Sequence, residues 1–135
     1  MDPELVALAE EMGWHVVYRD LGRRSGEVRS GGVIVINPRK GYLTQRMTLA
    51  HELGHVALGH DWGTRHDAAA DERAADIWAA GVLIKPDDYR MAEEIVGSHP
   101  GALAKELGVT AGLVVYWQQH HQRRGTFLRV VRPAS

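Results

Sequence analysis

The sequence has 135 residues, of which 44 % are hydrophobic and 24 % are charged, and its formal net charge is −1. This length and composition are typical of one globular domain, and they exclude a disordered tail, a collagen-like fibre and a membrane bundle. The chain has no cysteine. Disulfides, thiolate metal sites and cysteine nucleophiles are therefore excluded, and any metal must be held by histidine and carboxylate side chains.

Charge is unevenly distributed along the chain. From Leu107 to Ser135 the sequence holds four arginines and no acidic residue, which leaves −5 for the rest of a chain whose net charge is −1. This asymmetry permits an acidic partner for the C-terminal segment, and a solvated basic surface explains it equally well. The N-terminus has no basic-then-apolar signal, and no apolar run approaches about 18 residues, so we expect a cytoplasmic protein without membrane contact.

Hydrophobic periodicity and turn residues divide the chain into short elements. In chain order they predict a helix over 3–12, a strand over 14–19, a loose hairpin region over 21–32 with a short strand near Val28, a buried strand over 32–37, a helix over 44–59, a polar loop over 60–67, helices over 68–83, 86–96, 100–107 and 110–124, and a last strand over 126–131. This order predicts a single α+β domain over residues 1–135, in which a small N-terminal β-sheet packs on a helical core and further helices follow.

Residues 98–125 are similar to a helix-turn-helix segment. Gly108 separates the two expected helices, and Thr110 is a suitable N-cap for the second. Side chains that read bases normally lie near the start of the second helix, where this chain has only Ala111, Gly112 and Leu113. The segment is compatible with DNA binding, with docking of a protein partner and with plain packing. A salt-dependent affinity for duplex DNA would identify DNA binding.

The segment His51-Glu52-Leu53-Gly54-His55 gives the strongest chemical signal in the chain. Two histidines four residues apart lie on one face of a helix, about 6 Å apart along its axis, so both imidazoles can reach one ion. Glu52 projects too far round the helix to be an easy third ligand, and it is well placed to act on a water beside the metal. The flanking residues are mostly apolar, and a buried helix does not carry unpaired polar groups without a large energetic penalty. The segment therefore predicts a Zn²⁺ site.

A catalytic zinc site has three protein ligands and leaves one position open. The residues after the motif offer six candidates for the third ligand: His60, Asp61, His66, Asp67, Asp71 and Glu72. Glu72 is favoured because it lies on an Ala-rich helix that can pack closely against the histidine helix. Asp76, one turn further on, is placed to accept the second ring N–H of a ligand histidine. Asp61 is the rival ligand, and an ion pair with a neighbouring arginine is the alternative role for Glu72 and Asp76.

These residues resemble the ImmA/IrrE-type metallopeptidases of bacteria, phages and mobile elements. The resemblance rests on the strand that ends at Asn37, on the helix Met47–His55 and on the segment Glu72–Pro86, which lie within residues 33–86, a span of about 40 % of the chain. It implies a zincin-like helical core and a gluzincin-like site, in which His51, His55 and Glu72 hold zinc and Glu52 is the general base. Known members of this family are site-specific proteases that cut transcriptional repressors.

The sequence thus predicts a zinc-dependent endopeptidase of the HExxH type, with Glu52 as general base and with a protein substrate such as a transcriptional repressor or an antitoxin. An extended substrate is expected to bind by adding to the edge of the strand at Val33–Ile36. The alternative is a zinc-containing regulatory protein without peptidase activity, which uses the segment 98–125 to bind DNA or a protein partner.

Overall fold

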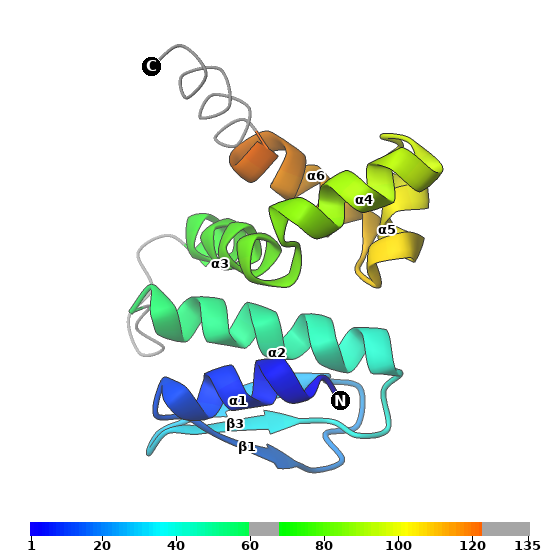
Figure 1. Cartoon of the computed structure of the whole chain (residues 1–135). Coiled ribbons are helices and arrows are strands. Elements are labelled where there is room, and N and C mark those ends of the chain that lie inside the picture. Colours follow the sequence, from blue (N-terminus) through cyan, green and yellow to red (C-terminus); the bar gives the residue numbers. More distant parts are fainter. Residues whose placement is uncertain (60–67, 123–135) are drawn as a thin grey trace. The chain divides into compact units, whose positions relative to one another are not determined.

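The computed structural model describes residues 1–59 and 68–122 (Figure 1). The chain divides into two compact units, of which the first comprises Met1–Ala75 and the second begins at Asp76. The loop expected over 60–67 and the strand expected over 126–131 fall outside the described residues. Across those residues the chain forms six α-helices and one three-stranded sheet, which confirms the expected α+β fold. No helix in the described part of the chain is both long and apolar enough to cross a membrane.

The first unit contains the three-stranded sheet and the two helices that cover one of its faces (Figure 1). In chain order its elements are α1 (Pro3–Glu11), β1 (His15–Tyr18), β2 (Gly26–Arg29), β3 (Val33–Ile36) and α2 (Tyr42–Ala57). The strand order is β1-β3-β2. β1 runs parallel to β3 with His15 opposite Val33, and β2 runs antiparallel to β3 with Gly26 opposite Ile36.

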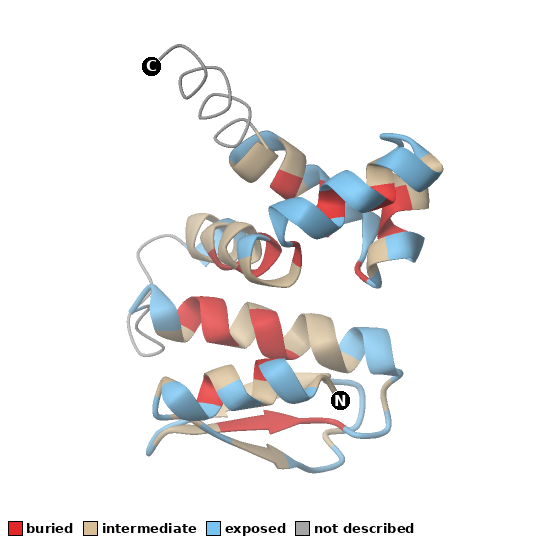
Figure 2. Ribbon diagram, viewed as in Figure 1, coloured by how far each residue is buried: buried red, intermediate tan, exposed pale blue. Residues whose placement is uncertain are grey.

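β3 forms the centre of the core of this unit. Its residues Ile34, Val35 and Ile36 are completely buried, and Figure 2 shows buried residues concentrated on β3 and along α2. A short run of β-branched residues without alternation is typical of a buried strand. α2 packs against β2 and β3, and α1 packs against β1 and α2.

The central position of β3 corrects one expectation. The strand Val33–Ile36 cannot add a peptide at its edge, because β1 and β2 already occupy both of its edges. The hairpin pattern in the sequence indicated the β2–β3 pair but not the position of β1, which joins β3 from the other side. Among the described strands, the outer edges of the sheet belong to β1 and β2.

Asp2 joins the start of α1 to α2. Its Oδ1 accepts hydrogen bonds from the backbone N–H groups of Glu4 and Leu5 at 3.0 and 3.2 Å, as an N-cap residue does. Its Oδ2 accepts a hydrogen bond from Nε of Arg46 on α2 at 3.0 Å, and both side chains are only 17 % exposed. Burial alone would raise the pKa of Asp2, but the Arg46 contact and the two backbone N–H groups together hold it below 3.8.

We expect Asp2→Ala to lower the free energy of unfolding at pH 7 by about 1 kcal/mol, because it removes both the cap and the partner of Arg46. Because folding lowers the pKa of Asp2, its contribution is present above pH 3.8 and is lost as the pH falls through the folded-state pKa. Urea unfolding followed by circular dichroism at pH 7 and pH 3 measures both effects. Asp2→Asn is the control, since it keeps a capping side chain and loses only the charge; equal stability of wild type and Asp2→Ala at pH 7 would contradict this account.

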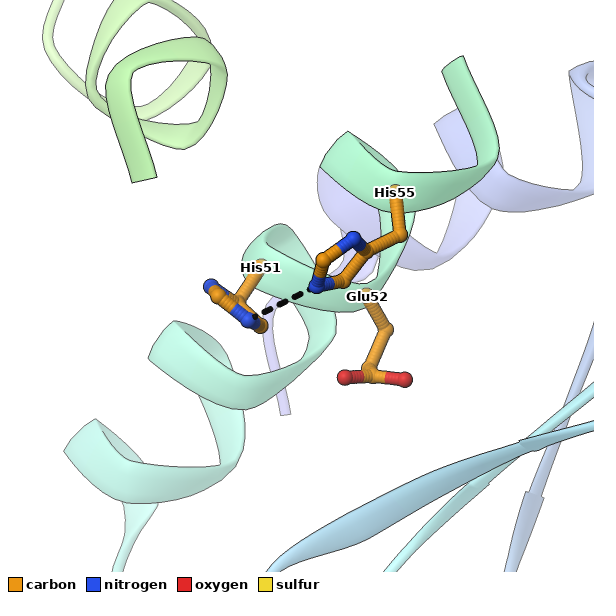
Figure 3. Close-up of side chains that lie close together, drawn as sticks. All are labelled: His51, Glu52 and His55. Carbon is orange, nitrogen blue, oxygen red and sulfur yellow. Dashed lines mark hydrogen bonds between the residues drawn. The ribbon is translucent and has the colours of Figure 1, made fainter. Parts of the chain in front are cut away.

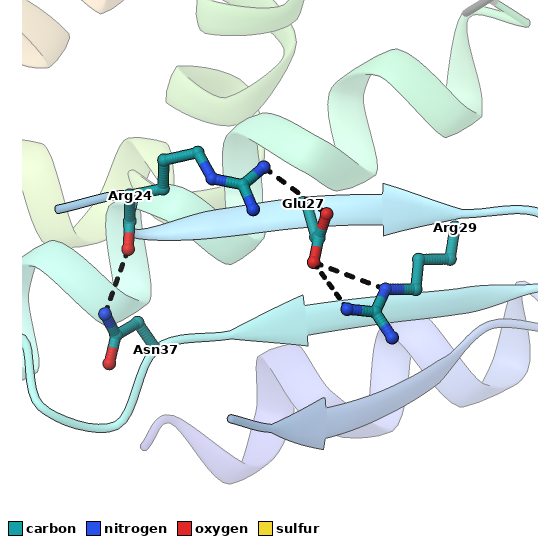
Figure 4. Close-up of polar contacts among 4 residues, drawn as sticks. All are labelled: Arg24, Glu27, Arg29 and Asn37. Carbon is teal, nitrogen blue, oxygen red and sulfur yellow. Dashed lines mark hydrogen bonds and ion pairs between the residues drawn. The ribbon is translucent and has the colours of Figure 1, made fainter. Parts of the chain in front are cut away.

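Asn37 fixes the loop between β1 and β2 against the end of β3. It is completely buried. Its Nδ2 donates to the carbonyl oxygen of Gly22 at 3.1 Å and to that of Arg24 at 3.0 Å, and Figure 4 shows the second of these bonds. Its Oδ1 accepts a hydrogen bond from the backbone N–H of Arg39 at 3.0 Å. The amide NH₂ of Asn37 therefore acts as a donor and its oxygen as an acceptor, and a replacement side chain would have to supply both.

Asn37→Asp should destabilise the first unit by about 3 kcal/mol at pH 7, because a buried carboxylate would face two carbonyl oxygens and could donate to neither. Asn37→Ala removes all three hydrogen bonds but buries no charge, so we expect it to be less destabilising. Protonation of the new aspartate removes its charge and supplies one donor. The free energies of unfolding of the two variants should therefore become more similar near pH 4. Urea unfolding of both variants at the two pH values tests this order, and an Asn37→Asp protein more stable than Asn37→Ala at pH 7 would refute it.

The second unit is helical in the part that is described. α3 (Ala68–Leu83) runs across the boundary between the two units, and α4 (Pro86–Val96), α5 (Pro100–Leu107), α6 (Ala111–Trp117) and a π-helical turn (Gln118–Gln122) follow. The bounds of α3, α4 and α5 match the sequence prediction. Gly108 adopts a left-handed conformation (φ 70°) after α5, and the Thr110 side chain accepts a hydrogen bond from the Leu113 N–H at 3.3 Å. Two helices thus flank Gly108 where the sequence predicts them, and the likeness of residues 98–125 to a helix-turn-helix stays a prediction.

The last predicted helix differs from the structure. We expected it to continue regularly to residue 124, but the α-helix ends at Trp117 and widens into the π-helical turn. The ring of Trp117 stacks on Tyr89 with centroids 4.2 Å apart, and Gln118 donates to the Tyr89 hydroxyl at 3.0 Å. In the turn, Nε2 of His121 lies 2.8 Å from the carbonyl oxygen of Ile77. These contacts with α3 and α4 are non-local, so helical periodicity does not reveal them.

Candidate metal centre

The two histidines of the motif meet on one face of α2. The helix is held by Leu49, Ala50 and Leu53, which are completely buried. On the same helix, Nε2 of His51 lies 3.1 Å from Nε2 of His55, and the two rings are almost perpendicular, with centroids 4.7 Å apart (Figure 3). His55 is buried, with 4 % exposure, and the His51 side chain is 22 % exposed. Helical spacing alone therefore brings two nitrogen ligand atoms to one point.

α3 adds a carboxylate to this pair. Oε2 of Glu72 lies 2.7 Å from Nε2 of His51, and Oε1 of Glu72 lies 2.9 Å from Nε2 of His55. Each carboxylate oxygen thus faces a different imidazole. The Glu72 side chain is 46 % exposed, so solvent reaches the carboxylate side of the cluster while His55 forms its buried side.

Glu52 belongs to the same cluster. One carboxylate oxygen of Glu52 and one nitrogen of each imidazole all lie within 4.8 Å of one another. Figure 3 shows the Glu52 carboxylate set apart from the point at which the two imidazole nitrogens meet. Glu72 makes contacts of 2.9 Å or less with both rings, so we regard Glu72 as the better third ligand and leave Glu52 beside the site.

The closeness of Glu72 depends on a feature that the sequence prediction missed. α2 and α3 approach each other backbone to backbone at Gly54 and Ala75. A Cβ atom added to Gly54 would lie 2.7 Å from the carbonyl oxygen of Ala75 and 3.0 Å from its Cα. The Ala-rich sequence of α3 indicated close packing, but the signal for contact at this point is a glycine inside an otherwise good helix, which usually has a packing or functional reason.

The donor set fits zinc. Ligand atoms bound tetrahedrally to zinc at 2.0–2.1 Å are about 3.3 Å from one another. The two imidazole Nε2 atoms lie 3.1 Å apart, and the nearer Glu72 oxygen lies 2.7 Å from that of His51 (Oε2) and 2.9 Å from that of His55 (Oε1). A small outward movement therefore gives a three-ligand site, and two imidazoles with one carboxylate are ligands that zinc accepts at catalytic sites.

The structure describes only some of the other side chains that the sequence offered for this site. Asp71 lies beside Glu72 on α3, and Asp76 lies one turn after Glu72, as the first residue of the second unit. A contact between Asp76 and a ligand histidine stays a prediction. The rival ligand Asp61 falls outside the described residues, together with His60, His66 and Asp67.

Comparison with known proteins agrees with the motif. The sequence matches the peptidase M78 family, described as the IrrE N-terminal-like domain, over residues 9–116. This range is more than half of the chain and contains both histidines, Glu52 and Glu72. A comparison with curated proteins gives no match. The expected resemblance is confirmed: the chain belongs to the IrrE N-terminal-like domain family and is a metallopeptidase-type domain.

Proposed function

We propose that this protein is a zinc-dependent endopeptidase that cleaves a protein substrate. The observation that supports the proposal most directly is the meeting of the Glu72 carboxylate with Nε2 of both His51 and His55, at 2.7 and 2.9 Å. These three residues would hold Zn²⁺. When bound, the ion supplies Lewis acidity, which polarises a peptide carbonyl and makes a water more acidic.

The side chains around the proposed zinc site have different roles. Neutral imidazoles present lone pairs at Nε2, and the Glu72 carboxylate adds one negative charge at the edge that solvent reaches. Glu52 follows His51 on the same helix, and its carboxylate lies close to the two imidazoles without being the best ligand. We assign Glu52 the role of general base: a carboxylate oxygen accepts the proton of the attacking water and then donates it to the leaving amine nitrogen.

The sheet suggests how the substrate is held. An extended peptide can add to an exposed sheet edge through main-chain hydrogen bonds. Because α2, which carries the histidines, packs against β2 and β3, we assign the substrate to the outer edge of β2. Glu27 on this strand is bonded to Arg29 and to Arg24 (Figure 4). The hydrogen bond from Arg29 is the main reason that the pKa of Glu27 lies below its ordinary value.

The substrate class follows from the family resemblance. We propose a transcriptional repressor or an antitoxin as substrate, in a regulatory system of a phage or mobile element, and a cytoplasmic location. The alternative, DNA binding through the helix-turn-helix-like segment, gains no support from α6. Its sequence Ala111–Trp117 contains no lysine or arginine, and Leu113, Val114 and Trp117 are buried.

Metal analysis combined with mapping of new N-termini tests the proposal. Purified protein is incubated with a bacterial lysate, and new N-termini are identified by mass spectrometry for wild type, for wild type with 1,10-phenanthroline, and for His51→Ala. We expect about one zinc per wild-type chain, a loss of most of it in His51→Ala, and new N-termini with untreated wild type only.

Two results would contradict the proposal in different ways. Less than about half a zinc per wild-type chain, unchanged in His51→Ala, would remove the metal site itself. Full zinc occupancy without new N-termini in any sample would favour a zinc-containing regulatory protein without peptidase activity.

A further inference from the structure

The crossing of α2 and α3 at Gly54 is tighter than ordinary helix packing. Side-chain contacts normally begin at 3.4 Å, whereas a Cβ at Gly54 would lie 2.7 Å from the backbone oxygen and 3.0 Å from the Cα of Ala75. A flexible side chain could rotate away from such a contact, but the backbone of a helix cannot. Any residue other than glycine at position 54 therefore requires the two helices to move apart.

The crossing lies in register with the proposed ligands. Gly54 follows His51 by three residues and precedes His55 by one, and Ala75 follows Glu72 by three residues. Residues three apart lie on the same face of a helix, one turn from each other. The separation of the two backbones at Gly54 and Ala75 therefore controls how far Glu72 reaches towards the two imidazoles.

We infer that Gly54 is a positioning residue for the metal centre: it brings the Glu72 carboxylate into contact with His51 and His55 by allowing α2 and α3 to cross in backbone contact. The inference rests on the proposed zinc site. To relieve the contact, the helices must separate by about 0.7 Å at the crossing. Binding constellations tolerate displacements of only about 0.5 Å, so a shift of this size is enough to weaken the site.

Helix propensity alone predicts that Gly54→Ala stabilises the protein, whereas the crossing predicts that it disturbs the metal site. The two effects can therefore be separated. Alanine is a better helix former than glycine, so Gly→Ala inside a helix is ordinarily stabilising where space permits. Gly112 in α6 offers the matched control, because no atom lies within 4 Å of a Cβ added there. Gly112→Ala should show only the effect of helix propensity. Gly54→Ala should show that effect together with the separation of α2 from α3.

The experiment measures zinc dissociation constants by competition with a chromogenic chelator, for wild type, Gly54→Ala, Gly112→Ala, Glu72→Gln and the double variant Gly54→Ala/Glu72→Gln. We expect Gly54→Ala to weaken zinc binding by at least about 10-fold and Gly112→Ala to change it by less than about 2-fold. If Gly54 acts through Glu72, the double variant should bind zinc within about 2-fold of Glu72→Gln alone. The absorption of bound Co²⁺ gives a second readout, and its spectrum in Gly54→Ala should shift towards that of Glu72→Gln.

Three results would overturn the inference. The first is a Gly54→Ala protein that binds zinc as wild type does. The second is a loss of zinc affinity in Gly54→Ala that multiplies with the loss in Glu72→Gln. The third is a loss of helical circular dichroism in Gly54→Ala at 10 °C, which would make Gly54 a folding residue. A wild-type chain that binds no zinc overturns both this inference and the proposed function, whereas zinc binding that is unaffected by Gly54→Ala overturns only the inference.

Discussion

Glu52→Gln is expected to lower the rate of peptide cleavage by about 10²–10⁴-fold, because the amide cannot accept the proton of the attacking water. The substitution preserves the size of the side chain and removes only its charge and its basicity. Because we assign the three ligand positions to His51, His55 and Glu72, zinc binding should stay within about 2-fold of wild type. Cleavage of a substrate identified by its new N-terminus, followed under single-turnover conditions, measures the rate.

The zinc content of the same variant is its control. A Glu52→Gln protein that loses zinc would show that Glu52 is a ligand, which its position within 4.8 Å of both imidazoles would permit. A variant that keeps both zinc and the wild-type rate would exclude Glu52 as the general base.

The second large effect is expected for Glu72→Gln. The carboxylate contacts both imidazoles, and a neutral amide is a poor replacement for a charged oxygen ligand, so zinc affinity should fall by at least about 100-fold. Chelator competition measures the dissociation constant, and circular dichroism checks that α3 remains folded.

Two further variants make this result specific. Glu94 is an exposed glutamate on α4 in the second unit, and Glu94→Gln makes the same chemical change outside the proposed ligand set, so it should leave zinc affinity unchanged. Asp61→Asn tests the rival ligand and should also have no effect. Tight zinc binding in Glu72→Gln together with its loss in Asp61→Asn would move the third ligand to Asp61 while preserving the metal site.

Features that depend on neighbours in the sequence could be predicted well. The start of α4 follows from Pro86 and the two aspartates after it, which suit the first turn of a helix. The two histidines are brought together by helical geometry within a single element. The start of α2 was harder to place: no side chain caps it at Gly41, and the helix begins at Tyr42, two residues before the predicted position.

Features that depend on distant parts of the chain could be predicted only in part. The pattern of β3 indicated a buried strand, but it did not reveal that β1 would pair on the side opposite β2. The sequence made Glu72 a candidate ligand, whereas its contact with the histidines depends on the angle and separation of two helices. Gly54 illustrates the limit most clearly, because a glycine in a helix carries no information about the backbone that approaches it.

The strand order β1-β3-β2 also has a consequence for the route by which the first unit assembles. β2 and β3 are separated by only a short turn, so this hairpin closes a small loop, whereas β1 must pair with β3 across the intervening β2 segment. The link from Asp2 to Arg46 spans 44 positions and closes a larger loop still. Because longer loops lose more chain entropy on closure, the hairpin is favoured as the early nucleus, and the amino-terminal helix and strand dock onto it late.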